Sequence, residues 1–448
     1  MKLSQIARVL DAKLKGKDRD FKSFSIDTRT IQPRSIFIAL QGPRFDAHDF
    51  VEVAVEKGAV GAIVSRPMKK TSFPKIYVNN THAVLIQLGN HQRNQMKEVI
   101  VVTVTGSCGK TTTRALLTSV FCQQGNVLAS ERSFNNNIGL PLTLLRLNAK
   151  HDYAVVELGA NHPGEIFELT QIAKPNIAII TNAGPAHLEG FGSIGGVAKS
   201  KGEIYQGLSP NGIAIVNNDD YFSDFWKEII GGRRTITFAC NNPADVTAKN
   251  ILVNSEGQPH FRLILPNGEI DVQLSLLGKH NVMNALATAA AAYSQHLPIA
   301  AIKSGLENAC AVDGRLVSRK GYKGATIIDD SYNANPLSVS AAIDVLVNCF
   351  GSRLILVLGD MLELTDSMGQ LHRKVGEQAL QSGIHELFCC GSLAYYTAEA
   401  FGSNGYHFSN KEKLLTALKN NLDENTVVLI KGSFSMNMGK IVNGLIEK

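Results

Sequence analysis

The stretch TGSCGKTTT, residues 105–113, holds the residue types of a phosphate-binding loop in the required order. The apolar run VIVVTV precedes it, and helical sequence follows from Lys110. Backbone N–H groups and the positive end of such a helix can surround phosphate oxygens. Lys110 would reach the β- and γ-phosphates, and the Thr111 hydroxyl would ligate Mg²⁺. The loop therefore predicts a nucleoside triphosphate site.

The loop is shorter than the strict Walker A pattern, because Val104 stands where that pattern has its first glycine. No dinucleotide pattern G-x-G-x-x-G is present here, which argues against NAD. The plain alternative is a glycine-containing turn with a surface lysine. The order of strand, glycines, lysine and hydroxyl favours the nucleotide site.

Three further side chains could complete a phosphoryl-transfer site. Glu157 closes the run YAVVE, and His187 follows the run NIAIITNAGPA. Either could be merely structural, but both follow strands of the same expected sheet, where Mg²⁺ ligands are needed. Lys201, in AKSKGEIY, lies on an expected helix and by itself indicates only a solvated lysine.

Polar residues cluster again later in the chain. Asn281 and Asn284 lie three residues apart at the start of an expected helix and share a face. Their amides could meet an adenine edge or a ribose, or could cap the helix, and the sequence leaves both open. Arg315 occurs in DGRL, and the segment DDSYNANP offers four more candidates, Asp330, Tyr332, Asn333 and Asn335. That segment could be a turn before its proline or a binding segment at a strand end.

The elements that must position these residues alternate between short apolar strands and helices, which is typical of α/β folds with parallel sheets. We expect three domains: a small α/β domain over 1–80, a central parallel-sheet ATPase domain of the P-loop type over 81–312, and a Rossmann-like C-terminal domain over 313–448. Parallel sheets bind ligands at the carboxyl ends of their strands. The candidate residues follow such strands.

Composition limits the function classes. The 448 residues are 44% hydrophobic and carry a net charge of +6, with Lys and Arg spread along the chain. This favours anionic small substrates over nucleic acid. No apolar run reaches the roughly 18 residues of a membrane span. Seven cysteines without zinc-like pairs suit a reducing compartment, so we expect a cytoplasmic protein. We also expect no membrane insertion and a monomeric chain.

Taken together, the motifs resemble those of the Mur ligases, the ATP-dependent amide-forming enzymes of bacterial peptidoglycan synthesis. They occur in the family's order: TGSCGKTTT, NNNIGLPLTLL, VELGANHPGEI, NAGPAHLEGFGS, AKSKGEIY, GKHNVMNALA, GRL and DDSYNANP. The resemblance implies three domains and closure of a mobile C-terminal domain. It also implies an acyl-phosphate intermediate, formed when a substrate carboxylate takes the γ-phosphate and released when an amine attacks.

The resemblance carries roles onto matching positions. It implies that Lys110 binds phosphates, that Thr111, Glu157 and His187 hold Mg²⁺, and that Lys201 is the lysine that the family carbamylates, with Lys199 as the second candidate. The nucleotide site would comprise Gly106, Ser107, Cys108, Gly109, Lys110, Thr111, Thr112, Asn137, Asn281, Asn284, Arg315, Asp330, Tyr332 and Asn333. A uridine-nucleotide site would comprise Ser25, Asp27, Thr28, Arg29, Gln41, Gly42, Phe45, Asp46 and His48.

Within the family, ANHPGEI, VLGDMLEL with His372, and KGS at 431–433 favour the member acting on UDP-N-acetylmuramoyl-tripeptide and D-alanyl-D-alanine. The missing DNPR signature disfavours the diamino acid ligase, and GDMLEL disfavours folylpolyglutamate synthase. A P-loop switch or motor ATPase is the rival from another class, but no Walker B aspartate is apparent. One departure is KGSFSMNMGK, where Phe434 and Gly439 replace the basic and acidic residues common in the family.

Overall fold

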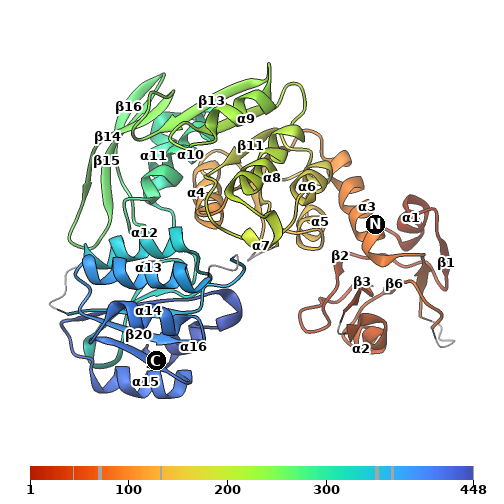
Figure 1. Ribbon diagram of the computed structural model, residues 1–448. Helices are drawn as coiled ribbons and strands as arrows, with labels where there is room; N and C mark the ends of the chain where they lie inside the picture. The colour runs from red at the N-terminus through yellow and green to blue at the C-terminus, as the bar shows by residue number, and fades with distance from the viewer. Residues whose placement is uncertain (44, 69–72, 132–133, 349–352, 365–367, 447–448) are drawn as a thin grey trace. The chain divides into compact units, whose positions relative to one another are not determined.

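The computed structural model of the chain describes residues 1–43, 45–68, 73–131, 134–348, 353–364 and 368–446 (Figure 1). It forms two compact units. Unit 1 comprises Met1–Thr103, Gly125–Gly159 and Phe167–Asn176, and unit 2 comprises Val104–Gln124, Ala160–Ile166 and Ile177–Lys448. Each unit is described by itself.

Unit 1 contains a five-stranded sheet in the order β1-β7-β6-β3-β2. Its strands are β1 (Lys13–Lys15), β2 (Ser23–Ser25), β3 (Ser35–Ile38), β6 (Gly61–Val64) and β7 (Lys75–Tyr77). Only β1 pairs antiparallel with its neighbour. Helices α1 (Leu3–Val9), α2 (Val51–Glu56) and α3 (Thr81–Gln95) supply apolar side chains to two separate cores. This sheet confirms the α/β character expected of the N-terminal region.

Alternation along β3 explains the two cores. Ile36 and Ile38 join the core that contains Leu85 of α3, whereas Phe37 joins the core that contains Ala54 of α2. Successive strand residues point to opposite faces, so a fully apolar run suits a sheet covered on both sides. The hairpin β4 (Gln41–Gly42) and β5 (Phe45–Asp46) follows, and then the 3₁₀ helix η1 (Ala47–Phe50).

The rest of unit 1 comes from the middle of the chain. It includes β9 (Val127–Ala129) paired in parallel with β10 (Tyr153–Glu157), α5 (Gly139–Leu144) and most of α6 (Glu165–Ala173). Strand β8 (Ile100–Thr105) carries the chain into unit 2, where it leads to α4 (Lys110–Phe121).

Unit 2 begins with a parallel series that ends in an antiparallel extension. Strands β11 (Ile177–Ile180), β12 (Ile213–Asn217), β13 (Arg234–Ala239) and β14 (Val246–Val253) run parallel, while β15 (Pro259–Leu265) and β16 (Gly268–Gln273) run antiparallel. The associated helices are α7 (Leu188–Phe191), α8 (Ile194–Gln206), α9 (Ser223–Ile230), α10 (Asn281–Ser294) and α11 (Ile299–Glu307). The sequence predicted the strand–helix alternation and α10 but neither β14 nor the antiparallel extension, whose strands carry no ligand-type signature.

The C-terminal part of unit 2 contains a six-stranded sheet in the order β17-β18-β22-β19-β20-β21. Its strands are β17 (Val317–Lys320), β18 (Thr326–Asp330), β19 (Arg353–Gly359), β20 (Glu386–Cys390), β21 (Gly405–Phe408) and β22 (Thr426–Lys431). All pairs except β17–β18 are parallel. The runs ATIIDDS, RLILVLGDM, ELFCCGS and TVVLIKGS each contain one of these parallel strands, which confirms the strand–helix alternation expected from the sequence.

Helices cover both faces of this sheet (Figure 1). On one face lie α12 (Pro336–Val347), α13 (Met368–Gln381) and α14 (Ala394–Phe401); on the other lie α15 (Lys411–Asn420) and α16 (Gly439–Leu445). Short 3₁₀ turns occur at η2 (Tyr322–Gly324) and η3 (Phe434–Met436). In β22, Leu429 packs in the first core and Val428 in the second, which is the period-two pattern of a covered strand.

Candidate active site

The loop after β8 has the backbone of a phosphate-binding loop. Gly106 and Gly109 have φ values of +149° and +82°, and α4 begins at Lys110. A Cβ on Gly106 would lie 1.9 Å from Thr181 Oγ1, and one on Gly109 would lie 2.4 Å from Asn284 Oδ1. Both positions therefore require glycine for backbone angle and for space. Lys110 Nζ donates to Gly106 O at 2.7 Å, so the lysine folds back over the loop.

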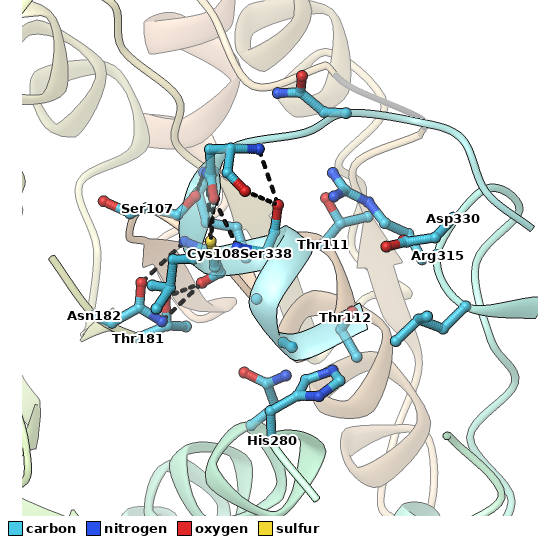
Figure 2. A pocket seen from close by; sticks show the side chains of 18 of the residues that line it. Ser107, Cys108, Thr111, Thr112, Thr181, Asn182, His280, Arg315, Asp330 and Ser338 are labelled. Atoms are coloured by element: carbon cyan, nitrogen blue, oxygen red, sulfur yellow. Dashed lines mark hydrogen bonds between the residues drawn. The ribbon is translucent and has the colours of Figure 1, made fainter. Parts of the chain in front are cut away.

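The segment after β11 holds this loop in place. Cys108 N donates to Asn182 Oδ1 at 2.9 Å, and Thr181 Oγ1 donates to Cys108 O at 2.6 Å. Ser107 Oγ lies 3.0 Å from Gly184 O and 2.9 Å from Gly184 N, donating to the first and accepting from the second. Figure 2 shows these side chains together. The hydroxyl of Ser107 thus supports the loop.

Two asparagines on α10 form hydrogen bonds that reach the helix following the phosphate-binding loop. Asn284 Oδ1 accepts from Thr113 Oγ1 at 3.2 Å, and Asn284 Nδ2 donates to Asn281 Oδ1 at 2.8 Å. Asn281 Nδ2 donates in turn to Leu277 O at 2.7 Å. Both asparagines are buried. Their amides form a network that holds the P-loop helix against α10, and neither caps α10.

A cavity of about 330 Å³ lies over the loop within unit 2. Its walls come from the loop, from the start of α10 and from the C-terminal sheet and α12. The lining includes these residues named from the sequence: Ser107, Cys108, Gly109, Lys110, Thr111, Thr112, His187, Asn281, Asn284, Arg315, Asp330 and Asn333. Residues as far apart in the chain as Ser107 and Lys431 thus line one pocket.

Asn335, a further candidate from the sequence, also lines the cavity. Other lining residues were not predicted from the sequence: Leu276, Leu277, His280, Met283, Leu337, Ser338, Leu362, Glu363 and Leu364. The apolar side chains among them suit a nucleobase. In the sequence these residues cannot be distinguished from residues of the hydrophobic core. His280 belongs to the motif GKHNVMN, so this motif is the sequence signal that could have identified it as a site residue. His280 is exposed where it lines the cavity, while the groups packed around its ring, and then the Lys431 charge, lower its pKa.

A buried ion pair forms one wall. Lys431 Nζ, at the end of β22, lies 2.6 Å from Asp330 Oδ2 at the end of β18, and their side chains are 1% and 8% exposed. Lys431 also donates to Asn333 O at 2.8 Å. Burial raises the pKa of the Asp330 carboxyl, and the Lys431 ammonium opposes that rise. The pair joins two strand ends beside Arg315.

His187 follows β11 in a left-handed conformation, with φ of +52°. Its Nδ1 lies 2.6 Å from Oε2 of Glu363, which follows β19 and also has a positive φ, +62°. The contact does not have the geometry of a hydrogen bond, so it is a close approach of a ring nitrogen to a carboxylate oxygen. The His187 contact lowers the pKa of Glu363. Two strained residues from distant segments therefore meet at the cavity.

The two candidate lysines on α8 differ in environment. Lys199 is exposed, whereas Lys201 is 1% exposed, with Nζ 5.4 Å from the centre of the Phe191 ring. In unit 1, Glu157 is buried and accepts a hydrogen bond from Asn135 Nδ2 at 2.9 Å. Asn137 is exposed in the same unit.

The residues named for a uridine nucleotide gather in two places in unit 1. Asp27 and Arg29 form a close bidentate pair after β2, where the Arg29 guanidinium lowers the pKa of Asp27. Ser25 Oγ donates to the carbonyl of Asp27 within the same turn, and Thr28 O accepts from Lys57 Nζ. The hairpin β4–β5 carries Gln41, Gly42, Phe45 and Asp46.

His48 is only 2% exposed and so supports this hairpin from inside. Its Nδ1 lies 2.5 Å from Asp46 Oδ1, and its Nε2 accepts from Ser65 N at 2.9 Å. Phe45, by contrast, is 58% exposed and available to a ligand.

Of the described helices, none is long and apolar enough to cross a membrane.

The fold and the cavity together define a nucleotide-binding α/β protein of the P-loop type. Comparison with family models matches residues 104–292 to the Mur ligase middle domain and residues 314–434 to the Mur ligase, glutamate ligase domain. The chain belongs to the Mur ligase family, an ATP-dependent family, which confirms the resemblance read from its motifs.

Named relatives agree over the full length. The chain is 43% identical to the UDP-N-acetylmuramoyl-tripeptide--D-alanyl-D-alanine ligase of Escherichia coli, covering 99% of this chain and 98% of that one. It superimposes on a crystal structure of MurF from Acinetobacter baumannii with TM-score 0.91 and 34% identity, covering 99% and 98% of the two chains. MurF ligase from Thermotoga maritima, in complex with ADP, gives TM-score 0.81 and 27% identity, covering 94% and 96%.

Proposed function

We propose that the chain is an ATP-dependent ligase that joins D-alanyl-D-alanine to UDP-N-acetylmuramoyl-tripeptide through an acyl phosphate. The observation that carries this proposal is the 43% identity, over nearly the whole of both chains, to a ligase of that name. The P-loop cavity supports it, because its lining combines the loop, apolar side chains and the buried Asp330–Lys431 pair. The reaction belongs to the cytoplasmic stage of peptidoglycan precursor synthesis.

The nucleotide's energy makes a poor electrophile reactive. The tripeptide carboxylate attacks the γ-phosphate of ATP, ADP leaves, and the acyl phosphate forms. The amine of D-alanyl-D-alanine then attacks the acyl carbon, phosphate leaves with its oxygen, and an amide and a proton result. Lys110 would stabilise the transferring phosphoryl group, and Arg315 and Asp330 would hold the nucleotide. A closed cavity would exclude water that hydrolyses acyl phosphates.

Mg²⁺ is the expected metal, and it would neutralise phosphate charge during transfer. The oxygens of Thr111 and Glu157 are donors that Mg²⁺ accepts readily, and His187 would add a nitrogen. An ammonium cannot ligate a cation, so Lys201 would take part only as a carbamate, formed when its neutral amine adds CO₂ and loses a proton. Of the two candidate lysines, Lys201 is buried and Lys199 is exposed, which supports this choice.

We further propose that residues 1–80 bind the uridine end of the substrate, that 81–312 bind ATP, and that 313–448 close over the site, with the chain acting as a monomer. The exposed Phe45 and the Asp27–Arg29 pair support the first assignment. Size-exclusion chromatography with light scattering tests the last one, and a dimer mass would contradict it.

Phosphate release from ATP with UDP-N-acetylmuramoyl-tripeptide tests the function. We expect release only with D-alanyl-D-alanine, compared with D-glutamate, diaminopimelate and no acceptor. Release that depends on another acceptor, or on none, would overturn the proposal.

For Lys201, we expect Lys201→Ala to be inactive and to regain activity with short carboxylic acids; full activity without them would exclude the carbamate.

A further inference from the structure

The Arg315 guanidinium has unused hydrogen-bond donors and packs against an aromatic ring. It lines the ATP cavity, and its guanidinium carbon lies 4.2 Å from the centre of the Tyr332 ring. Across the described ranges of the chain, its guanidinium makes no hydrogen bond or ion pair. A flexible side chain with unused donors is therefore held by one aromatic face.

Tyr332 is itself fixed on two sides. Its backbone N–H donates to Gly314 O at 3.2 Å, which ties it to the residue preceding Arg315. Phe434 packs against its ring with centres 5.6 Å apart and planes at 55°. Phe434 itself remains 69% exposed. Phe434 therefore packs against the Tyr332 ring, and the Tyr332 ring in turn packs against the Arg315 guanidinium.

The Tyr332 ring lies outside the ATP cavity. It lines a separate hollow with Phe434, Asp313 and Arg319, whereas its neighbours Asp330 and Asn333 line the ATP cavity. A direct contact between Tyr332 and a nucleotide is therefore not required to explain its place. Its ring instead contacts the Arg315 guanidinium, and Arg315 lines the ATP cavity.

We propose that Tyr332 is a positioning residue that stacks on Arg315 and orients its donors towards the ribose or phosphate oxygens of the nucleotide, with Phe434 as the brace. An arginine has many rotamers, and immobilising one during binding weakens affinity. An aromatic face that holds the guanidinium beforehand reduces that loss. Phe434 occupies the position where a basic residue is common in the family; a cation there would repel Arg315.

Binding of ADP with Mg²⁺, measured by titration calorimetry, tests the proposal. Tyr332→Ala should weaken binding by about two- to fivefold, the factor that a cation–π contact at a partly exposed site supplies. Tyr332→Phe keeps the ring and should bind like the unchanged protein. Phe434→Ala should act in the same direction with a smaller factor. Tyr395→Ala, at an exposed aromatic of α14, is the matched control and should change nothing.

A double-mutant cycle separates positioning from direct contact. If Tyr332 acts through Arg315, Tyr332→Ala should cause no further loss in an Arg315→Ala background. Additive losses, or an unchanged affinity in Tyr332→Ala, would overturn the proposal. Should the alanine variant fail to fold, Tyr332→Leu keeps apolar bulk without the ring and is expected to show the same non-additivity.

The inference rests on the proposed function only in taking the ligand to be a nucleotide. ADP binding is measured without tripeptide or dipeptide, so it does not depend on the ligase reaction. A chain that binds ADP but releases phosphate without the dipeptide would contradict the proposed function alone. A chain with dipeptide-dependent release and additive binding losses would contradict the inference alone.

Discussion

Glu363 and His187 meet across the ATP cavity, with Oε2 of the first 2.6 Å from Nδ1 of the second, although 176 positions separate them. Both residues have positive φ. Strained conformations of this kind persist where surrounding contacts fix them. Here Leu362 N donates to Ser433 Oγ at 2.8 Å and Met361 N donates to His372 Nε2 at 3.0 Å. These two hydrogen bonds hold the segment 361–363, which follows β19, so that Glu363 reaches His187.

Glu363→Ala should lower the rate of dipeptide-dependent phosphate release by roughly tenfold, because His187 loses the group that holds its ring. Stability should change by less than about 1 kcal/mol, since the pair is partly exposed. Glu363→Gln keeps an oxygen at the same place and should retain more of the rate. Glu377→Ala, at an exposed carboxylate of α13, is the control. Equal rates in Glu363→Ala and the control would contradict the assignment.

Gly109→Ala should abolish measurable ATP binding. The residue has φ of +82°, and its new Cβ would lie 2.4 Å from Asn284 Oδ1, so the loop or the asparagine network must move. The backbone angle alone costs about 1 kcal/mol. Gly383→Ala isolates that cost, because Gly383 has φ of +83° with no atom near its Cβ position. Nucleotide titration and thermal midpoints of both variants give the comparison. Similar behaviour of the two would mean that the Asn284 contact is unimportant.

Lys431→Met should destabilise unit 2 by about 3–5 kcal/mol, because it leaves the buried Asp330 carboxylate without its cation. Lys431→Met combined with Asp330→Asn removes both charges and should recover a large part of that loss. The measurement is the urea midpoint of the transition that includes the C-terminal sheet. A double variant as unstable as the single one would show that the pair itself, and not the unpaired charge, determines stability.

His372 predicts a specific acid sensitivity. It is fully buried, its Nε2 accepts from Met361 N, its Nδ1 lies 2.7 Å from Met368 O, and burial lowers its pKa. The unfolded chain binds a proton near pH 6.5 while the folded chain keeps this imidazole neutral. Stability from this group is therefore present above about pH 6.5 and is lost as the pH falls towards the lower folded-state pKa.

His372→Gln keeps an acceptor for Met361 N but does not titrate. Its urea midpoint should fall less between pH 7 and pH 5 than that of the unchanged protein. His407→Gln, at an exposed histidine of β21, should retain the full fall. A pH dependence in His372→Gln equal to that of the unchanged protein would contradict the prediction.

The sequence predicted those parts of the site that lie within single elements. The order of residues from β8 to α4 is local, so the P-loop, its two glycines and Lys110 could be identified from their spacing. Asn281 and Asn284 share a helical face for the same reason. Strands such as β18 and β22 were recognisable because a covered strand is apolar on both faces, and their polar ends marked one edge of a sheet.

Tertiary structure alone decided which of these ends meet. The 2.6 Å contact of Lys431 with Asp330, the approach of Glu363 to His187 and the stacking of Arg315 on Tyr332 depend on how strands are ordered and helices packed. It also decided that the asparagines support the loop and that β15 and β16 extend the parallel series. Local periodicity fixes distances inside an element, but distances between elements follow from the packing of the whole core. Spacing in the chain therefore could not supply them.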